Sequence, residues 1–518
     1  MALRLPVNPE LLNQMKQNLL IKVLMLISVV GFSQDDALMQ KYGALIKPAE
    51  LKDNLSIIAS DALEGRMTGT RGQKMAAAFI ANHFREIGLQ APVNGSYYQT
   101  VPLYESKLGD VYLNLGGQTV QNFTDMFYFG DEETTGEVKV PVVFVGQGRD
   151  EDFSQVDLNG KVALIFLAKL DFNAMRQFRA TAKKARDKGA VYVLAASTGT
   201  SEEFDRMAGI VKGFAGGGDL TLEKPGSKPK GGTFFVKGTL AAKALNTTFE
   251  KLKAASDADS KKQALKKVKP GMISLQITRS SKEVPSENVL GYLPGTDKKD
   301  ELIIVTAHFD HIGKREGEGD AINNGADDDG SGTVSVMQLA KAFAEAKKNG
   351  NGPRRSMLFM TVTGEEEGLF GSEYYTSNPV FPLANTVVDL NMDMIGRTDS
   401  KYATDKNYVY VIGADKLSSE LHSINERLNS TYTKLKFDYV YNDENHPDRL
   451  YYRSDHWNFA KNNVPIIFYF DGIHEDYHKV SDEVSKIDFD LLALRARCVF
   501  NVAWELANRE ERIKVDKK

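Results

Sequence analysis

The second half of the chain alternates between short apolar runs and segments with helical spacing. A short apolar run bounded by turn residues is typical of a buried strand, whereas apolar residues three or four positions apart are typical of a helix. The apolar runs are at 302–305, 357–362, 387–392 and 464–470, and the clearest helical segment is at 331–346. Strands that alternate with helices predict an α/β fold with a mostly parallel central sheet flanked by helices.

The first half of the chain has a different pattern. Helical spacing at 51–63 and 73–88 predicts two helices, which we assign to residues 35–100 of the sheet-bearing domain. From Val101 the pattern changes to strand-like runs with one helix, before the regular alternation starts near Pro285. The strand-like runs are at 111–115, 140–145, 162–167 and 191–195, and the helix is at 173–188. We therefore predict a separate β-rich module at 101–284, inserted before the main part of the sheet-bearing domain at 285–512.

The N-terminus carries an apolar run at 23–32 that follows basic residues and precedes Ser33. This order is typical of a secretory signal peptide, which predicts cleavage near Ser33 and a secreted or periplasmic protein. The run is too short for a stable membrane anchor. An amphipathic first helix is the alternative, and Met15 is an alternative start to Met1.

The composition narrows the classes of partner and site. With 518 residues, 26% of them charged, and a net charge of -4, the chain has neither a disordered composition nor the basic surface of a nucleic-acid-binding protein. Cys498 is the only cysteine, so an intramolecular disulfide and a zinc–thiolate cluster are both excluded. Any metal site must therefore use histidine, aspartate and glutamate.

Potential metal ligands follow each apolar run of the predicted sheet, at the carboxyl ends where such sheets bind ligands. Taken singly, each of these residues has an ordinary explanation as a hydrogen-bonded histidine, a solvated acid or a helix cap. Together they match the ligand set of two metal ions that share a carboxylate. In chain order the residues are His308, Asp310, Glu365, Glu366, Asp393, Tyr477 and His478.

An acidic loop at 325–332 lies between the first two runs and holds three adjacent aspartates, 327–329. Three neighbouring carboxylates repel one another unless cations are bound. A calcium loop is one alternative, but the glutamate at the twelfth position and the flanking helix of an EF-hand are missing. The loop therefore supports the interpretation of a dinuclear metal site.

Five motifs resemble the two-zinc exopeptidases, the family of bacterial leucyl aminopeptidases, glutamate carboxypeptidase II and the transferrin receptor. They are AHFDH at 307–311, GADDDGSG at 325–332, GEEEGLFGS at 364–372, NMDMIG at 391–396 and DYHKVSDE at 476–483. The module at 101–284 is similar to a protease-associated domain, on looser motifs. The resemblance implies the zinc exopeptidase fold with this domain inserted.

The resemblance also implies a ligand set for two zinc ions per chain. His308 and Asp393 would bind one ion, Glu366 and His478 the other, and Asp328 would bridge them. Asp328 matches the family's bridging position three residues before Ser331, while Asp327 and Asp329 stay open as alternatives. Cobalt or manganese would accept the same nitrogen and oxygen ligands.

Further roles follow from the resemblance. Glu365 would be the general base, Tyr477 would donate a hydrogen bond to the oxyanion, and Asp310 would accept the second N–H of His308. His474 is a weaker ligand candidate than His478, because only His478 follows the tyrosine. The segment 454–456 is expected to form a wall of the site.

The implied activity is hydrolysis of the N-terminal bond of peptide substrates by an exported zinc aminopeptidase. A carboxypeptidase usually binds the terminal carboxylate through an arginine fork, and the only arginines near the motifs are Arg397, Arg449 and Arg453. A carboxypeptidase of the glutamate carboxypeptidase type remains the main alternative. A glutaminyl cyclase and a catalytically silent receptor-like protein are less consistent with a complete ligand set.

Overall fold

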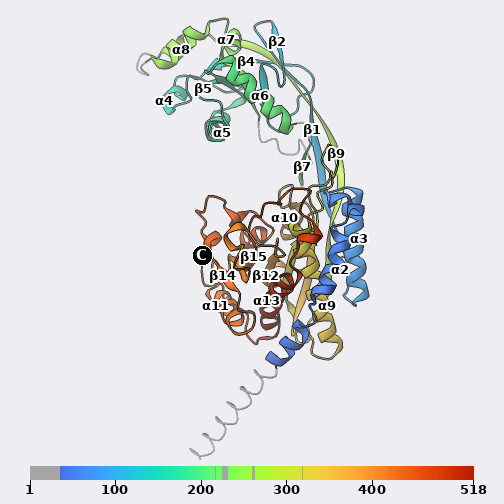
Figure 1. Cartoon of the computed structure of the whole chain (residues 1–518). Helices are drawn as coiled ribbons and strands as arrows, with labels where there is room; N and C mark the ends of the chain where they lie inside the picture. The colour runs from blue at the N-terminus through green and yellow to red at the C-terminus, as the bar shows by residue number, and fades with distance from the viewer. Residues whose placement is uncertain (1–34, 216–217, 225–231, 259–262, 318, 518) are drawn as a thin grey trace, which may run out of the picture. The chain divides into compact units, whose positions relative to one another are not determined.

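The structure is a computed structural model that describes residues 35–215, 218–224, 232–258, 263–317 and 319–517. The predicted signal peptide at 1–33 lies outside the described residues. The chain divides into two compact units (Figure 1): one contains the residues up to Val101 and from Pro285 onward, and the other is Pro102–Val284. Among the described residues, we find no helix with the length and apolar character required to cross a membrane.

The first unit is built on a sheet with the strand order β14-β13-β15-β12-β10-β11-β9. Strands β11, β10, β12 and β15 are parallel, whereas β13 and the end of β9 at 289–293 pair antiparallel with their neighbours β15 and β11. The bounds are β9 Gly271–Leu293, β10 Lys298–His308, β11 Arg355–Val362, β12 Thr386–Met392, β13 Tyr408–Ile412, β14 Lys436–Asp438 and β15 Ile466–Phe470. The predicted mostly parallel sheet is confirmed.

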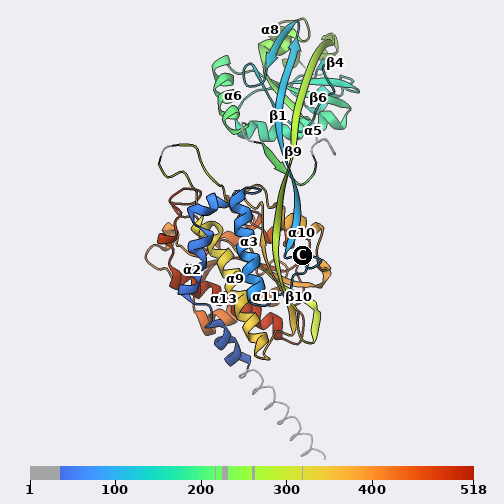
Figure 2. The same ribbon diagram turned by 90° about the vertical axis from the view of Figure 1, so that its right-hand side faces the viewer.

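Both faces of this sheet are covered, which explains why its central strands are continuous apolar runs. Ile303 and Val305 face one core, and Leu302 and Ile304 face the other. Helices α2, α3, α9 and α13 pack together over the first face (Figure 2), and α10 and α12 pack over the other. The helices are α2 Pro48–Ile58, α3 Arg71–Glu86, α9 Gly332–Lys348, α10 Phe370–Ser377, α11 Ser419–Leu428, α12 His456–Ala460 and α13 Phe489–Asn508.

The second unit contains parallel strands in the order β4-β5-β6-β8, with β3 antiparallel to β8. It has more helix than the sequence analysis predicts. Helix α6 was not predicted because it contains Gly209 and Gly213, which disfavour a helix, and α8 was not predicted because it is short. Its strands are β1 Tyr98–Leu115, β2 Gln118–Gln121, β3 Met126–Phe129, β4 Val138–Phe144, β5 Lys161–Leu167, β6 Ala190–Ser197, β7 Asp219–Thr221 and β8 Thr233–Lys237. Its helices are α4 Asp150–Phe153, α5 Phe172–Asp187, α6 Ser201–Ala215, α7 Gly238–Lys243 and α8 Phe249–Asp257.

Candidate metal centre

The carboxyl ends of the parallel strands bring the predicted site residues together. His308 is the last residue of β10, and Asp393 directly follows β12, which pairs with β10. Glu365 and Glu366 follow β11, the other neighbour of β10, after a short turn. The predicted candidates therefore lie at one edge of the sheet because neighbouring parallel strands end there.

Asp328 lies between two of the predicted imidazoles. Its Oδ1 is 3.3 Å from Nε2 of His308, and its Oδ2 is 3.1 Å from Nε2 of His478. Each imidazole also faces a second carboxylate, since His308 Nε2 is 3.6 Å from Asp393 Oδ1 and His478 Nε2 is 3.0 Å from Glu366 Oε2. The five predicted ligands thus form two groups that share the Asp328 carboxylate.

The next aspartate in the loop, Asp329, has a different set of contacts. Its carboxylate accepts hydrogen bonds from three backbone amides, those of His308 at 3.1 Å, Gly332 at 2.8 Å and Met394 at 3.2 Å. These amides belong to three separate segments, so Asp329 holds the ends of β10 and β12 against the start of α9. Asp329 also lies close enough to His308 and Asp393 to hold one ion with them. A carboxylate that is already used by three backbone donors is nevertheless a poorer bridging ligand than Asp328.

Asp327 is also occupied by protein groups. Its Oδ1 accepts a hydrogen bond from the Gly396 amide at 2.7 Å, and its Oδ2 lies 3.2 Å from Nε2 of His474. His474 is therefore paired with Asp327 and does not belong to the two groups around Asp328. The contacts favour Asp328 over both alternatives that the sequence leaves open.

The side chains around Asp328 fit a pair of divalent cations. Nε2 of His308 and Oδ2 of Asp328 are buried, and their nearest polar neighbours, at 3.1–3.6 Å, are other side chains of the two groups. Burial opposes the charged form of His308, but the carboxylates of Glu365, Asp393 and Asp328 raise its pKa well above 6.5. The site therefore stabilises positive charge, and its nitrogen and oxygen donors are those that zinc accepts.

His478 has the same electrostatic environment in the second group. Burial opposes its charged form, but Asp328 and Glu366 raise the pKa of His478 to about 10. The two imidazoles also act on Asp328: although burial disfavours its charge, they hold the pKa of this carboxyl well below 3.8. An ionised Asp328 between two imidazoles is the arrangement that a bridging carboxylate would have once cations replaced the imidazole protons.

His311 is an additional histidine to which the sequence analysis gave no role. Its Nδ1 lies 2.7 Å from Oε1 of Glu366 and 3.8 Å from Oδ2 of Asp328, and its side chain is fully buried. His311, Asp328 and Glu366 also lie close enough together to hold one ion. The signal was present in the sequence, because His311 is the last residue of the AHFDH motif.

The two histidines beside Glu366 can be distinguished by metal content. We expect His478→Gln to bind about one metal ion per chain, because its Nε2 faces both Asp328 and Glu366. We expect His311→Gln to retain two ions with affinity lowered about 10–100-fold, the usual cost of losing a group that orients a ligand. Elemental analysis and metal titration of both variants check this assignment. The reverse pattern would make His311 the ligand.

Asp310 differs from its prediction in one respect. Nδ1 of His308 lies 3.1 Å from the backbone carbonyl oxygen of Asp310 and 3.8 Å from its carboxylate, so the carbonyl is the hydrogen-bond acceptor. The Asp310 carboxylate instead accepts from the Thr68 hydroxyl at 2.9 Å and the Glu365 amide at 3.3 Å. Asp310 therefore orients His308 through its main chain and holds the Glu365 turn through its side chain.

Glu365 and Tyr477 have the surroundings expected for groups that contact substrate. The Glu365 side chain is 11% exposed, with Oε2 3.8 Å from Nε2 of His308. Burial raises the pKa of Glu365 well above 4.5, and repulsion from Asp393 and Glu366 adds to this effect. Tyr477 stacks on the ring of His478, with 3.9 Å between the ring centroids. Glu365 and Tyr477 line the same pocket.

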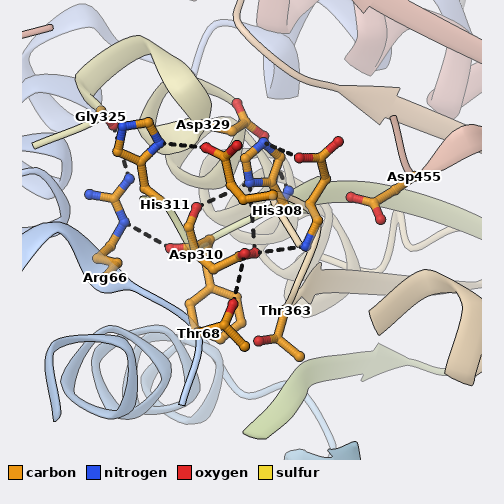
Figure 3. Close-up of polar contacts among 12 residues, drawn as sticks. Arg66, Thr68, His308, Asp310, His311, Gly325, Asp329, Thr363 and Asp455 are labelled. Atoms are coloured by element: carbon orange, nitrogen blue, oxygen red, sulfur yellow. Dashed lines mark hydrogen bonds and ion pairs between the residues drawn. The ribbon is translucent and has the colours of Figure 1, made fainter. Parts of the chain in front are cut away.

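The N-terminal segment supplies groups that sequence reasoning missed (Figure 3). Arg66 is fully buried and donates to the carbonyl oxygens of Phe309 at 2.8 Å, Asn324 at 2.6 Å and Gly325 at 3.0 Å. These carbonyls belong to the loops that carry His308 and Asp328, so one side chain joins both loops. The local pattern around Arg66 contains no signal for this role, because its partners lie more than 240 residues away.

The predicted wall segment at 454–456 contacts the site directly. The Ser454 hydroxyl donates to Oδ2 of Asp393 at 2.7 Å, and Asp455 accepts from the Ser372 hydroxyl at 2.5 Å. Burial raises the pKa of Asp455 to about 7. Ser454 thus fixes one carboxylate of the site, while Asp455 fixes the start of α10.

Comparisons with known proteins show which chains this one is similar to. Residues 288–503 match the family model of Peptidase family M28. The aminopeptidase from Aneurinibacillus sp. strain AM-1 has a similar structure, with a TM-score of 0.50 and 18% identity over 93% of this chain and 98% of that chain. At this identity the similarity shows the fold, a mostly parallel sheet flanked by helices.

Two curated fungal proteins are similar in sequence. A probable zinc metalloprotease of Pyricularia oryzae is 26% identical over 282 residues, which are 47% of this chain and 54% of that protein. A probable leucine aminopeptidase of Trichophyton verrucosum is 28% identical over 225 residues, which are 42% of this chain and 57% of that protein. The chain thus spans about half the length of these relatives.

Proposed function

We propose that this chain, whose residues 288–503 match the model of Peptidase family M28, is a two-zinc aminopeptidase that hydrolyses the N-terminal bond of peptides. The observation that carries the proposal is the position of Asp328, whose two carboxylate oxygens face His308 and His478 at 3.3 and 3.1 Å. Asp393 and Glu366 complete one group each. This arrangement would hold two cations that share one carboxylate.

In the proposed reaction, Glu365 takes a proton from the attacking water and passes it to the leaving amine. Bound zinc ions would supply polarisation of the peptide carbonyl and a lowered pKa of water. The raised pKa of Glu365 suits a group that must both accept and release a proton. Tyr477 lines the same pocket and would donate its hydroxyl to the oxyanion.

The carboxylates around the site favour a free amino terminus. Asp328, Glu365 and Asp393 line one pocket, and such a site, with the proposed cations bound, would still accept the substrate amine beside them. An N-terminal amine would therefore be bound beside the bond to be cleaved. The alternative, a carboxypeptidase, would need cationic groups for the terminal carboxylate, and Arg453 is a cationic residue of the same pocket, so a panel of substrates must separate the two activities.

Metal content and a panel of three substrates test the proposed function. We expect two zinc ions per chain by elemental analysis and loss of activity with a chelator. We expect rapid hydrolysis of an unblocked aminoacyl 4-nitroanilide and little hydrolysis of its N-acetylated form or of an N-blocked dipeptide with a free C-terminus. Preferential cleavage of the N-blocked dipeptide would establish the carboxypeptidase, and a fully active metal-free protein would refute both.

We further propose that the enzyme is exported, on the basis of the apolar run at 23–32. N-terminal sequencing of the protein from its native host should give a mature chain that begins near Ser33. The double substitution Leu24→Arg and Leu26→Arg interrupts the apolar run and should leave the chain uncleaved. A native protein that begins at Met1 would contradict export.

A further inference from the structure

The pocket beside the candidate metal centre has one cationic side chain among acidic and apolar ones. Its acidic side is formed by Asp328, Glu365 and Asp393. Apolar side chains, among them Met394 and Phe468, form much of the remaining wall, and Arg453 completes it. The cavity itself is small, about 40 Å³, and it opens to solvent, so only the end of a substrate group, such as a carboxylate, would lie within it.

The backbone of Arg453 is held close to the metal centre. Its amide donates to the carbonyl oxygen of Leu450 at 3.1 Å, which closes a short helical turn. The next residue, Ser454, donates its hydroxyl to Asp393 at 2.7 Å. Arg453 therefore directly precedes a residue that contacts the proposed ligand Asp393, so the position of its backbone relative to the site is fixed.

The charge of Arg453 is not used by the protein. Although three carboxylates line the same pocket, none of the described acidic groups lies within ion-pair distance of its guanidinium, and its side chain is exposed. Arg449, in the same loop, differs in that its guanidinium lies over the ring of Tyr452, 4.7 Å from the centroid. Of these two arginines, only Arg453 lines the pocket.

We propose that Arg453 binds a carboxylate of the substrate and thereby determines which peptides the enzyme prefers. The inference rests on the proposed peptidase function. Guanidinium groups bind carboxylates through two parallel charge-assisted hydrogen bonds. The carboxylate is either the side chain of an acidic N-terminal residue or the terminal carboxylate of a dipeptide.

Two matched substrate pairs separate these sources. Glutamyl and glutaminyl 4-nitroanilides differ only in a side-chain carboxylate, and Leu-Gly and Leu-Gly-amide differ only in the terminal carboxylate. In the wild-type enzyme, kcat/KM for the acidic member of one pair should exceed that of its neutral partner. Arg453→Met should lower that ratio about tenfold to a hundredfold, the range of a charge-assisted hydrogen bond. Arg453→Lys, which keeps the charge without the fork, should lower it less.

Arg449→Met is the matched control, because it removes an arginine of the same loop that is engaged on Tyr452. It should leave both ratios unchanged. A fall in the Glu/Gln ratio alone identifies an acidic N-terminal residue, and a fall in the dipeptide ratio alone identifies the terminal carboxylate. Wild-type cleavage of the neutral substrates, with both ratios unaffected by Arg453→Met, would overturn this inference and leave the proposed function intact. A wild-type protein that cleaves none of the four substrates would refute the proposed function itself.

Discussion

We expect Glu365→Gln to lower kcat by about 10²–10⁴-fold while two metal ions per chain remain bound. Gln is nearly isosteric with Glu but can neither accept the proton of the attacking water nor return it to the leaving amine. Glu365 is not one of the five proposed ligands, and it does not contact the pair formed by Asp328 Oδ2 and His478. Its replacement should therefore leave the proposed ligand set intact. Steady-state kinetics on an aminoacyl anilide, together with elemental analysis, measure both effects.

Glu367→Gln provides the matched control for this prediction. Glu367 lies two residues further along the same loop and is exposed, so the same chemical change there should leave kcat within about twofold. Wild-type activity in Glu365→Gln would remove Glu365 from its proposed role. Loss of metal in this variant would show instead that Glu365 is a ligand.

The central sheet could be predicted from the sequence because its strands are buried on both faces. Each of the four apolar runs after Pro285 became one of the parallel strands β10, β11, β12 and β15. The short edge strand β14 was not predicted, because the three residues Lys436–Asp438 are too few to show a periodic pattern. Patterns of this kind thus reveal the middle of a sheet better than its edges.

The candidate site was predictable to the extent that its residues follow strands. His308, Glu365, Glu366 and Asp393 come within a few positions of a strand end, so the parallel order of the sheet is enough to bring them together. The choice of Asp328 within the acidic triplet depended on a resemblance. The contacts of Asp327 and Asp329 with backbone amides supply the physical reason, and no sequence pattern contains it.

Contacts between distant segments could not be predicted. Arg66 joins the His308 and Asp328 loops through three carbonyl groups, and Thr68 holds the Asp310 carboxylate. Backbone carbonyls have no residue-specific signal, so a single sequence gives no indication that an arginine binds them. The family resemblance implied the Asp310 carboxylate as the acceptor of the His308 N–H, whereas the backbone carbonyl of that residue is nearer.

The bridging role of Asp328 leads to the second large effect. We expect Asp328→Asn to abolish binding of two metal ions and to remove nearly all activity, because both proposed groups lose their shared anion. The amide presents an N–H₂ group to one of the two imidazoles, where a shared ligand must offer oxygen on both sides. Elemental analysis after dialysis against zinc, followed by activity on an anilide, measures the outcome.

Asp329→Asn is the matched comparison, since it makes the same change one residue further along. Asp329 accepts hydrogen bonds from the amides of His308, Gly332 and Met394, so its replacement leaves a buried donor without an acceptor and should cost about 1–3 kcal/mol of stability. The cost should therefore appear as a lower Tm even in the metal-free protein. Asp328→Asn should also lower the metal-free Tm, because it removes the anion that faces the His308 and His478 imidazoles. Metal content therefore separates the two variants, since Asp329→Asn should still bind both ions. If Asp329→Asn kept its metal-free Tm but lost both ions, then Asp329 would be the bridging ligand and Asp328 a supporting residue.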